Sequence, residues 1–174
     1  VRTLDRLAHN VAKQLMIDSI EIATLLFDST FQQKMGYDKE TMACMFIPET
    51  YQVYWDMSAD SFFERMQKEH KRFWNDERLA KAQAIGMTPE EVCTLASIVE
   101  EETNNNGEKP MVAGLYINRL QRGMPLQADP TIKFALQDFG LRRITNENLR
   151  VESPYNTYIN TGLPPGPIRI PSTK

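Results

Sequence analysis

A sharply marked helix start at residues 88–92, TPEEV, constrains the fold of this chain more than any other segment. Thr88 is a favoured N-cap residue, and Pro89 suits the first helical position because its missing N–H would have no partner there. Glu91 lies three residues after Thr88, as in a capping box. The apolar run VCTLASIV follows and ends on three glutamates, residues 100–102. The pattern predicts one helix that carries carboxylates at its C-terminal end.

Apolar residues recur at helical spacing over much of the remaining chain. Residues 1–44 predict several short helices, with Asp18 as the N-cap of one of them. Residues 58–74 predict a longer amphipathic helix. Residues 109–123 predict a further helix, which Gly123 ends.

Two segments depart from helical spacing. Residues 45–55, MFIPETYQVYW, are rich in β-branched and aromatic residues, which indicates an extended strand with Pro48 at its start or on a sheet edge. Residues 153–171 contain five prolines and predict a rigid loop. We therefore predict an α+β fold that is largely helical with a small β-sheet, in which the glutamate-bearing helix lies beside the Pro/Gly-rich loop. We expect an N-terminal part at 1–80 and a second domain at 81–174.

The composition excludes several classes of protein. The chain has 174 residues, of which 41% are hydrophobic, so it can bury a core and is not expected to be disordered. Its net charge is -3, and charged residues of both signs are scattered along the chain. The absence of a basic stripe in the sequence argues against a nucleic-acid partner. The longest apolar runs are shorter than the ~20 residues that span a bilayer.

The side chains that most often bind metals show no ligand pattern. Cys44 and Cys93 lie far apart in apolar surroundings, so we expect two small buried hydrophobic side chains. His9 and His70 are expected in or at the edge of the core, because no second ligand type is spaced with either. We predict no metal site and, without a phosphate-binding glycine loop, no cofactor.

The three glutamates differ in their expected surroundings. At about 100° per residue, Glu100 falls inside the apolar arc between Ala96 and Cys93, and Glu101 falls outside it. A carboxyl against apolar side chains resists ionisation, which suits a general acid near neutral pH. Glu102 falls on the opposite shoulder of the arc, about 160° from Glu100, so the two cannot converge on one metal ion.

Two interpretations of this helix end remain open at this point. Glu100 is either a partly buried general acid or one charge of a solvated helix end, since charged helix ends are common. Glu102 is expected to have a structural role, with Arg119 or Arg122 of the following helix as its partner.

Five short motifs then occur in a fixed order. They are LASIVEEET (95–103), GLYINRL (114–120), GMPLQADPT (123–131), SPYNTY (153–158) and GLPPGPI (162–168). Together they resemble the YceG-like endolytic murein transglycosylases, the MltG family. The resemblance is strong over about residues 86–171, and MFIPETY (45–51) resembles an element just upstream of the family's catalytic region. The first forty residues match loosely, in a region that corresponds to an incomplete LysM-like subdomain.

The resemblance implies a lyase that acts on peptidoglycan. Such an enzyme cleaves the β-1,4 bond between N-acetylmuramic acid and N-acetylglucosamine without water, because the muramoyl C6 hydroxyl attacks the anomeric carbon and leaves a 1,6-anhydro end. Glu100 matches the family's catalytic glutamate and would act first as acid and then as base. Family members often carry a lysine where this chain has Glu101, a position that we expect to face solvent.

Sugar recognition needs amides and hydroxyls for acetamido groups, together with flat rings for pyranose faces. By the same resemblance, the expected substrate-binding residues are Asn118, Gln127, Asp129, Tyr155, Asn156, Thr157 and Tyr158. Two other functions stay open. One is a glycoside hydrolase that pairs Glu100 with Asp129 as its second carboxylate, and the other is a glycan-binding module without activity. For Asp129 we favour, over this catalytic role, the interpretation as the N-cap of a helix that starts at Pro130.

The resemblance also implies a location and partners. The expected partners are peptidoglycan glycan strands and, beyond them, peptidoglycan synthases. The expected location is extracytoplasmic, in the periplasm or on the outer face of the cytoplasmic membrane. A single N-terminal transmembrane helix outside this sequence would anchor the full-length protein.

Overall fold

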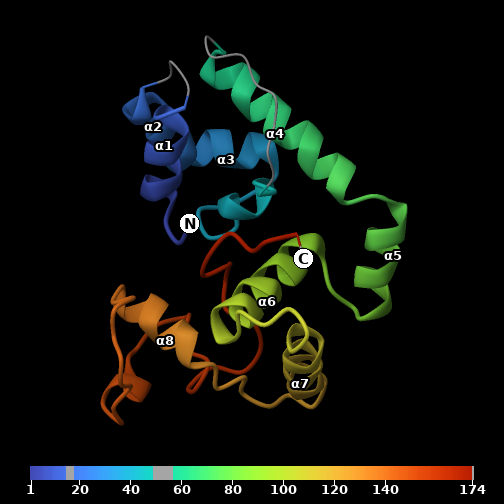
Figure 1. The fold of residues 1–174 in the computed structure, drawn as a ribbon, viewed down its shortest axis with the longest axis vertical. Coiled ribbons are helices and arrows are strands. Elements are labelled where there is room, and N and C mark those ends of the chain that lie inside the picture. Colours follow the sequence, from blue (N-terminus) through green and yellow to red (C-terminus); the bar gives the residue numbers. More distant parts are fainter. Residues whose placement is uncertain (15–17, 49–56, 174) are drawn as a thin grey trace. The chain divides into compact units, whose positions relative to one another are not determined.

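The computed structural model describes residues 1–14, 18–48 and 57–173, which form two compact units (Figure 1). The first unit contains Val1–Pro89 together with the terminal segment Arg169–Thr173, and the second contains Glu90–Ile168. The first unit therefore extends beyond residue 80, and the expected functional division of the chain stays a prediction.

Helices with polar N-caps build the first unit. They are α1 (Leu4–Ala12), α2 (Ser19–Phe27), α3 (Ser29–Met35), the 3₁₀ turn η1 (Met42–Met45), α4 (Ala59–Phe73) and α5 (Asp76–Ala84). The side chain of Asp18 accepts a hydrogen bond from the Ile20 N–H at 2.8 Å, as an N-cap does. Ser58 caps α4 in the same way. The helices predicted in residues 1–44 and 58–74 are confirmed.

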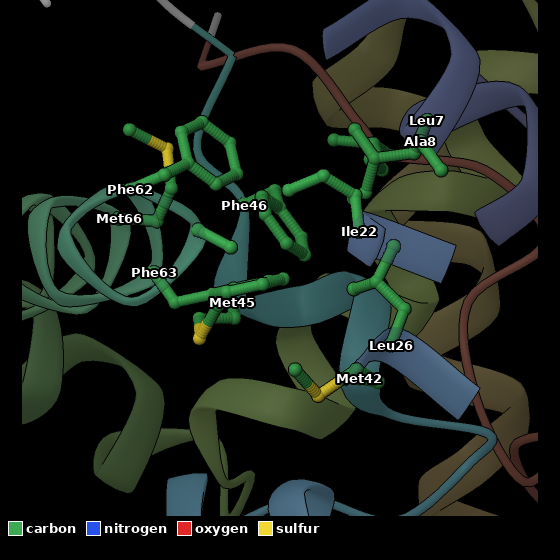
Figure 2. Close-up of a cluster of buried hydrophobic side chains, with 12 residues drawn as sticks. Leu7, Ala8, Ile22, Leu26, Met42, Met45, Phe46, Phe62, Phe63 and Met66 are labelled. Atoms are coloured by element: carbon green, nitrogen blue, oxygen red, sulfur yellow. The ribbon is translucent and has the colours of Figure 1, made fainter. Parts of the chain in front are cut away.

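The core of the first unit gathers apolar side chains from α1, α2, η1 and α4 (Figure 2). Phe63 on α4 is fully buried, and its ring meets Phe31 and Phe62 edge to face, with ring centroids 4.8 and 5.4 Å away. Ile22 and Leu26 of α2 are buried in the same cluster. Burial of each such side chain contributes about 1.5–3 kcal/mol, so this cluster stabilises the unit.

The prediction of a small β-sheet was wrong for the residues that the structure describes, since they contain helices and loops but no strand. Met45 ends the 3₁₀ turn η1, and Phe46 follows it without regular structure. Both side chains are buried among the helices, so their apolar character serves a helical core. Residues 49–55 of the predicted strand lie outside the described residues.

Three α-helices and a long loop form the second unit. The helices are α6 (Pro89–Glu102), α7 (Lys109–Gln121) and α8 (Asp129–Leu136), with the 3₁₀ turn η2 (Asn148–Arg150) after them. Helix α6 begins at Pro89, as predicted, and α7 is followed by Gly123 in the left-handed conformation at φ 65°. Residues 151–168 contain no helix or strand, which confirms the predicted loop over this stretch.

No helix in the described part of the chain has both the length and the apolar character needed to cross a bilayer.

Candidate active site

Helix α6 carries the three glutamates, and its buried face differs from the predicted one. The buried residues are Thr94, Leu95, Ser97, Ile98 and Val99, whereas Cys93 and Ala96 are only partly buried. Ser97 can be buried because both of its hydrogen-bonding functions are used. Its hydroxyl donates to the Thr94 carbonyl at 2.6 Å and accepts from the Ile168 N–H at 3.0 Å. The hydrogen bond from the Ile168 N–H joins α6 to the end of the Pro/Gly-rich loop.

Glu100 lies in the last turn of α6 with its side chain 15% exposed, so the carboxylate is largely shielded from water. Its Oε1 lies 3.9 Å from the Nζ of Lys109, the first residue of α7, whose side chain is also 15% exposed. The helical wheel led us to expect small apolar neighbours and not this ammonium group. A carboxylate paired inside a shielded site is screened much less by salt than a surface pair.

Glu102 departs from its predicted surroundings. It is exposed, and its Oε1 accepts a hydrogen bond at 2.9 Å from the hydroxyl of Tyr116 on α7. Burial raises the pKa of the Tyr116 phenol, and the Glu102 charge beside it raises the pKa further. Arg119, one of the expected partners of Glu102, donates instead to the Leu126 carbonyl at 2.6 Å. Glu101, which we expected to face solvent, is partly buried.

A second phenol–carboxylate pair joins α8 to the loop after η2. The hydroxyl of Tyr158 donates a short hydrogen bond to Oδ1 of Asp129. Burial, together with this hydrogen bond, raises the pKa of Tyr158 to about 12. Asp129 is the first residue of α8 and Ala128 takes the N-cap position, so the favoured interpretation of Asp129 as the N-cap was wrong.

The two phenol–carboxylate pairs act on each other electrostatically. The charge of Glu102 contributes to the raised pKa of Tyr158, and Arg119 opposes the shift at both phenols. Such mutual effects require short separations, because charges in water interact weakly beyond about 10 Å. The hydrogen bonds themselves join the C-terminal end of α6 to α7, through Glu102 and Tyr116, and the N-terminal end of α8 to the loop after η2, through Asp129 and Tyr158.

Gln127 projects from a backbone segment that is fixed on both sides. Its own backbone is left-handed, at φ 54°, and its N–H donates to the Thr157 carbonyl at 3.2 Å. Next to it, the Ala128 N–H donates to the Thr157 hydroxyl at 2.9 Å, and that hydroxyl lies 2.9 Å from the hydroxyl of Thr131. A left-handed glutamine costs about 1–2 kcal/mol, which these hydrogen bonds offset. Gln127 itself is exposed.

The other expected sugar-binding residues differ in what their side chains contact. Asn156 is fully buried, and its amide donates to the carbonyls of Leu149 and Val151 at 3.0 and 2.8 Å. Tyr155 packs on the ring of Phe134, with centroids 4.6 Å apart. Asn118 is exposed on α7. The polar groups of Asn156 and Thr157 thus support the loop from within, and all of these binding roles stay predictions.

Sequence reasoning missed two contact residues of the glutamates on α6: Lys109, beside Glu100, and Tyr116, which donates to Glu102. The sequence did contain a signal for Tyr116, because a tyrosine whose phenol is buried on a helix needs a hydrogen-bond partner for its hydroxyl. Lys109 gave none, since its contact with Glu100 depends on the conformation of the loop between α6 and α7. In the described part of the chain, no group of three or more His, Cys, Asp or Glu side chains could hold a metal ion.

Comparisons with known proteins agree with the motifs. The model of the YceG-like family matches residues 1–174, so the chain belongs to the YceG-like family. A crystal structure of a yceG-like protein from Listeria monocytogenes matches the fold with a TM-score of 0.74 and 30% identity, over 98% of this chain and 60% of that one. The family resemblance inferred from the motifs is confirmed.

Curated relatives carry a functional name. The endolytic murein transglycosylase of Bacillus subtilis strain 168 is 45% identical over 75 residues, which is 43% of this chain and 21% of that protein. The protein of the same name from Streptococcus pneumoniae serotype 2 is 39% identical over 90 residues, which is 49% of this chain and 16% of that protein. The matched regions thus span about a fifth of these relatives or less.

Proposed function

We propose that this chain carries the catalytic region of a peptidoglycan lytic transglycosylase. Two curated relatives named endolytic murein transglycosylase support this function. The structural observation that carries the proposal is the largely shielded carboxylate of Glu100 at the end of α6. Two residues further along the same helix, Glu102 accepts a hydrogen bond from Tyr116. A general acid needs such a shielded carboxyl within reach of polar groups that can hold a substrate.

In the proposed reaction Glu100 acts twice. Its carboxyl proton passes to the glycosidic oxygen while the bond from the anomeric carbon to that oxygen breaks. The carboxylate then removes the proton from the muramoyl C6 hydroxyl, whose oxygen closes the 1,6-anhydro ring. Glu100 ends the cycle protonated, so no water or second carboxylate is consumed. The attacking hydroxyl belongs to the same sugar, which gives it a high effective concentration.

The remaining residues are assigned by what their side chains contact. Gln127, Asn118 and the Asp129–Tyr158 pair are exposed or partly exposed, so they are proposed to bind sugar acetamido and hydroxyl groups. Tyr155 is proposed to contribute its ring to a sugar face. Asn156 and Thr157 are proposed to act indirectly, because their polar atoms hold the loop that presents Tyr158.

Replacement of the proposed acid tests the assignment. We expect Glu100→Gln to lower the rate of cleavage of purified peptidoglycan by at least about 10²-fold, because the amide cannot donate the proton. Binding of glycan strands should persist, since the side chain keeps its size. Glu101→Gln, one residue away on the same helix, is the matched control and should retain activity. Cleavage by Glu100→Gln at the rate of the unaltered protein would refute the assignment.

The location and partners follow from the proposed substrate. We propose extracytoplasmic action on glycan strands, with peptidoglycan synthases as neighbouring enzymes. Co-purification of a synthase with the full-length protein from solubilised membranes would support that partner.

A further inference from the structure

Helices α6 and α7 both place charges at unfavourable ends. The C-terminal end of a helix carries partial negative charge, yet the last turn of α6 contains acidic side chains and no basic one. The N-terminal end of a helix carries partial positive charge, yet the first residue of α7 is the basic Lys109, although the N-cap residue before it, Glu108, is acidic. Glu100 and Lys109 thus each occupy a helix end that disfavours their charge, and such departures concentrate at functional sites.

The ion pair between Glu100 and Lys109 joins these two ends. Its atoms lie 3.9 Å apart and both side chains are 15% exposed. The Glu77–Lys81 pair on α5 is shorter, at 2.8 Å, but its side chains are 73% and 74% exposed. Shielding from water strengthens an electrostatic interaction, so the Glu100–Lys109 pair is less weakened by solvent and salt than an exposed pair at the same distance.

The loop between the two helices fixes the position of Lys109. The carboxylate of Glu108 accepts hydrogen bonds from the Thr103 hydroxyl at 2.8 Å and from the Asn105 amide at 3.2 Å. The side chain of Asn105 also accepts from the Gly107 N–H at 2.9 Å. These bonds close the turn from the end of α6 to the start of α7, so they fix the point from which the Lys109 side chain reaches Glu100.

We propose that Lys109 is a positioning residue that stabilises the negative charge developing on Glu100 during the reaction. This inference rests on the proposed function, in which Glu100 gives its proton to the glycosidic oxygen. As the proton leaves, the carboxyl becomes a carboxylate, and the ammonium group stabilises that charge at the transition state. Later the carboxylate takes the proton of the C6 hydroxyl, and Lys109 keeps its own proton throughout. An interaction of this kind is stronger in the transition state than before it and so raises kcat.

The test compares three variants in peptidoglycan cleavage. We expect Lys109→Met to lower kcat about tenfold and to leave KM within about twofold, because an interaction made mainly in the transition state affects kcat alone. Lys109→Arg keeps the positive charge and should retain at least about a third of the kcat of the unaltered protein. Lys81→Met removes the lysine of the exposed pair on α5 and should leave kcat and KM unchanged.

Three outcomes would overturn the inference. The first is an unchanged kcat in Lys109→Met, and the second is a raised KM at constant kcat, which would make Lys109 a substrate-binding residue. The third is an equal loss in Lys109→Arg and Lys109→Met, which would indicate packing and not charge. Thermal unfolding of each variant identifies loss of fold, and Lys109→Arg decides the question if Lys109→Met does not fold. Failure of the proposed function differs from all three, because the unaltered protein would then leave no 1,6-anhydro ends or Glu100→Gln would cleave as fast as the unaltered protein.

Discussion

At the scale of single residues, Gln127 combines an exposed side chain with a left-handed backbone. Gln137 has the same backbone conformation, at φ 53°, but it follows α8 as the C-cap, where that conformation is common. Gln137 has this conformation at a helix end, whereas Gln127 has it where its own N–H donates a hydrogen bond to the Thr157 carbonyl. We propose that the left-handed backbone of Gln127 serves to present its exposed carboxamide to a substrate.

A pair of glycine substitutions tests this difference. Glycine adopts positive φ without strain, so Gln127→Gly and Gln137→Gly should both leave the free energy of unfolding within about 1 kcal/mol of the unaltered protein. Only Gln127→Gly should lower the rate of peptidoglycan cleavage, because it removes the carboxamide. Chemical denaturation and the cleavage assay measure the two effects. Full activity in Gln127→Gly would contradict a binding role.

The raised pKa of Tyr158 predicts a dependence of stability on pH. Its phenol ionises at about 12 in the folded protein, against about 10 in an unfolded chain. Between these values the folded state holds a proton that the unfolded state has lost, so stability is intact below pH 10 and falls as pH rises toward 12. Tyr158→Phe should reduce this slope in denaturation measured across that range. An unchanged slope would show that the Tyr158–Asp129 pair is not the cause.

At the scale of elements, helix starts and stops were predictable because they depend on adjacent residues. Asp18 and Pro89 mark starts, and Gly123 marks a stop, without reference to any distant segment. The buried face of α6 was not predictable in the same way. The wheel counted only apolar side chains, whereas the two hydrogen bonds of Ser97, one of them with Ile168, allow this polar residue to be buried.

The Ser97 hydroxyl should therefore contribute to the stability of the second unit. We expect Ser97→Ala to lower the free energy of unfolding by about 1–3 kcal/mol, because it leaves the buried Ile168 N–H without that partner. Thr94→Val is the matched control, since the Thr94 hydroxyl donates only within α6, to the Glu90 carbonyl at 2.9 Å. Its effect should stay below about 1 kcal/mol. Equal losses in urea denaturation would argue against the role of the Ile168 contact.

At the scale of the whole molecule, the family was accessible from the sequence and the fold class was not. Five ordered motifs are a specific signal, and the family match over residues 1–174 agrees with them. A strand, in contrast, is defined by a partner elsewhere in the chain, so β-branched and aromatic composition at 45–55 could not establish one. Met45 and Phe46 show the outcome, because the helical core takes up their side chains. The Glu100–Lys109 contact was inaccessible for a similar reason, since it depends on how α6 and α7 are joined.

The most direct test of the central claim is the chemistry of the cleaved end. Purified peptidoglycan should be digested by the full-length protein in water labelled with heavy oxygen, and the fragments analysed by mass spectrometry. If Glu100 acts as a single acid and base, the new ends carry 1,6-anhydro-N-acetylmuramic acid and take up no label. Reducing ends that contain the heavy oxygen would show that water is the nucleophile, and they would contradict the account.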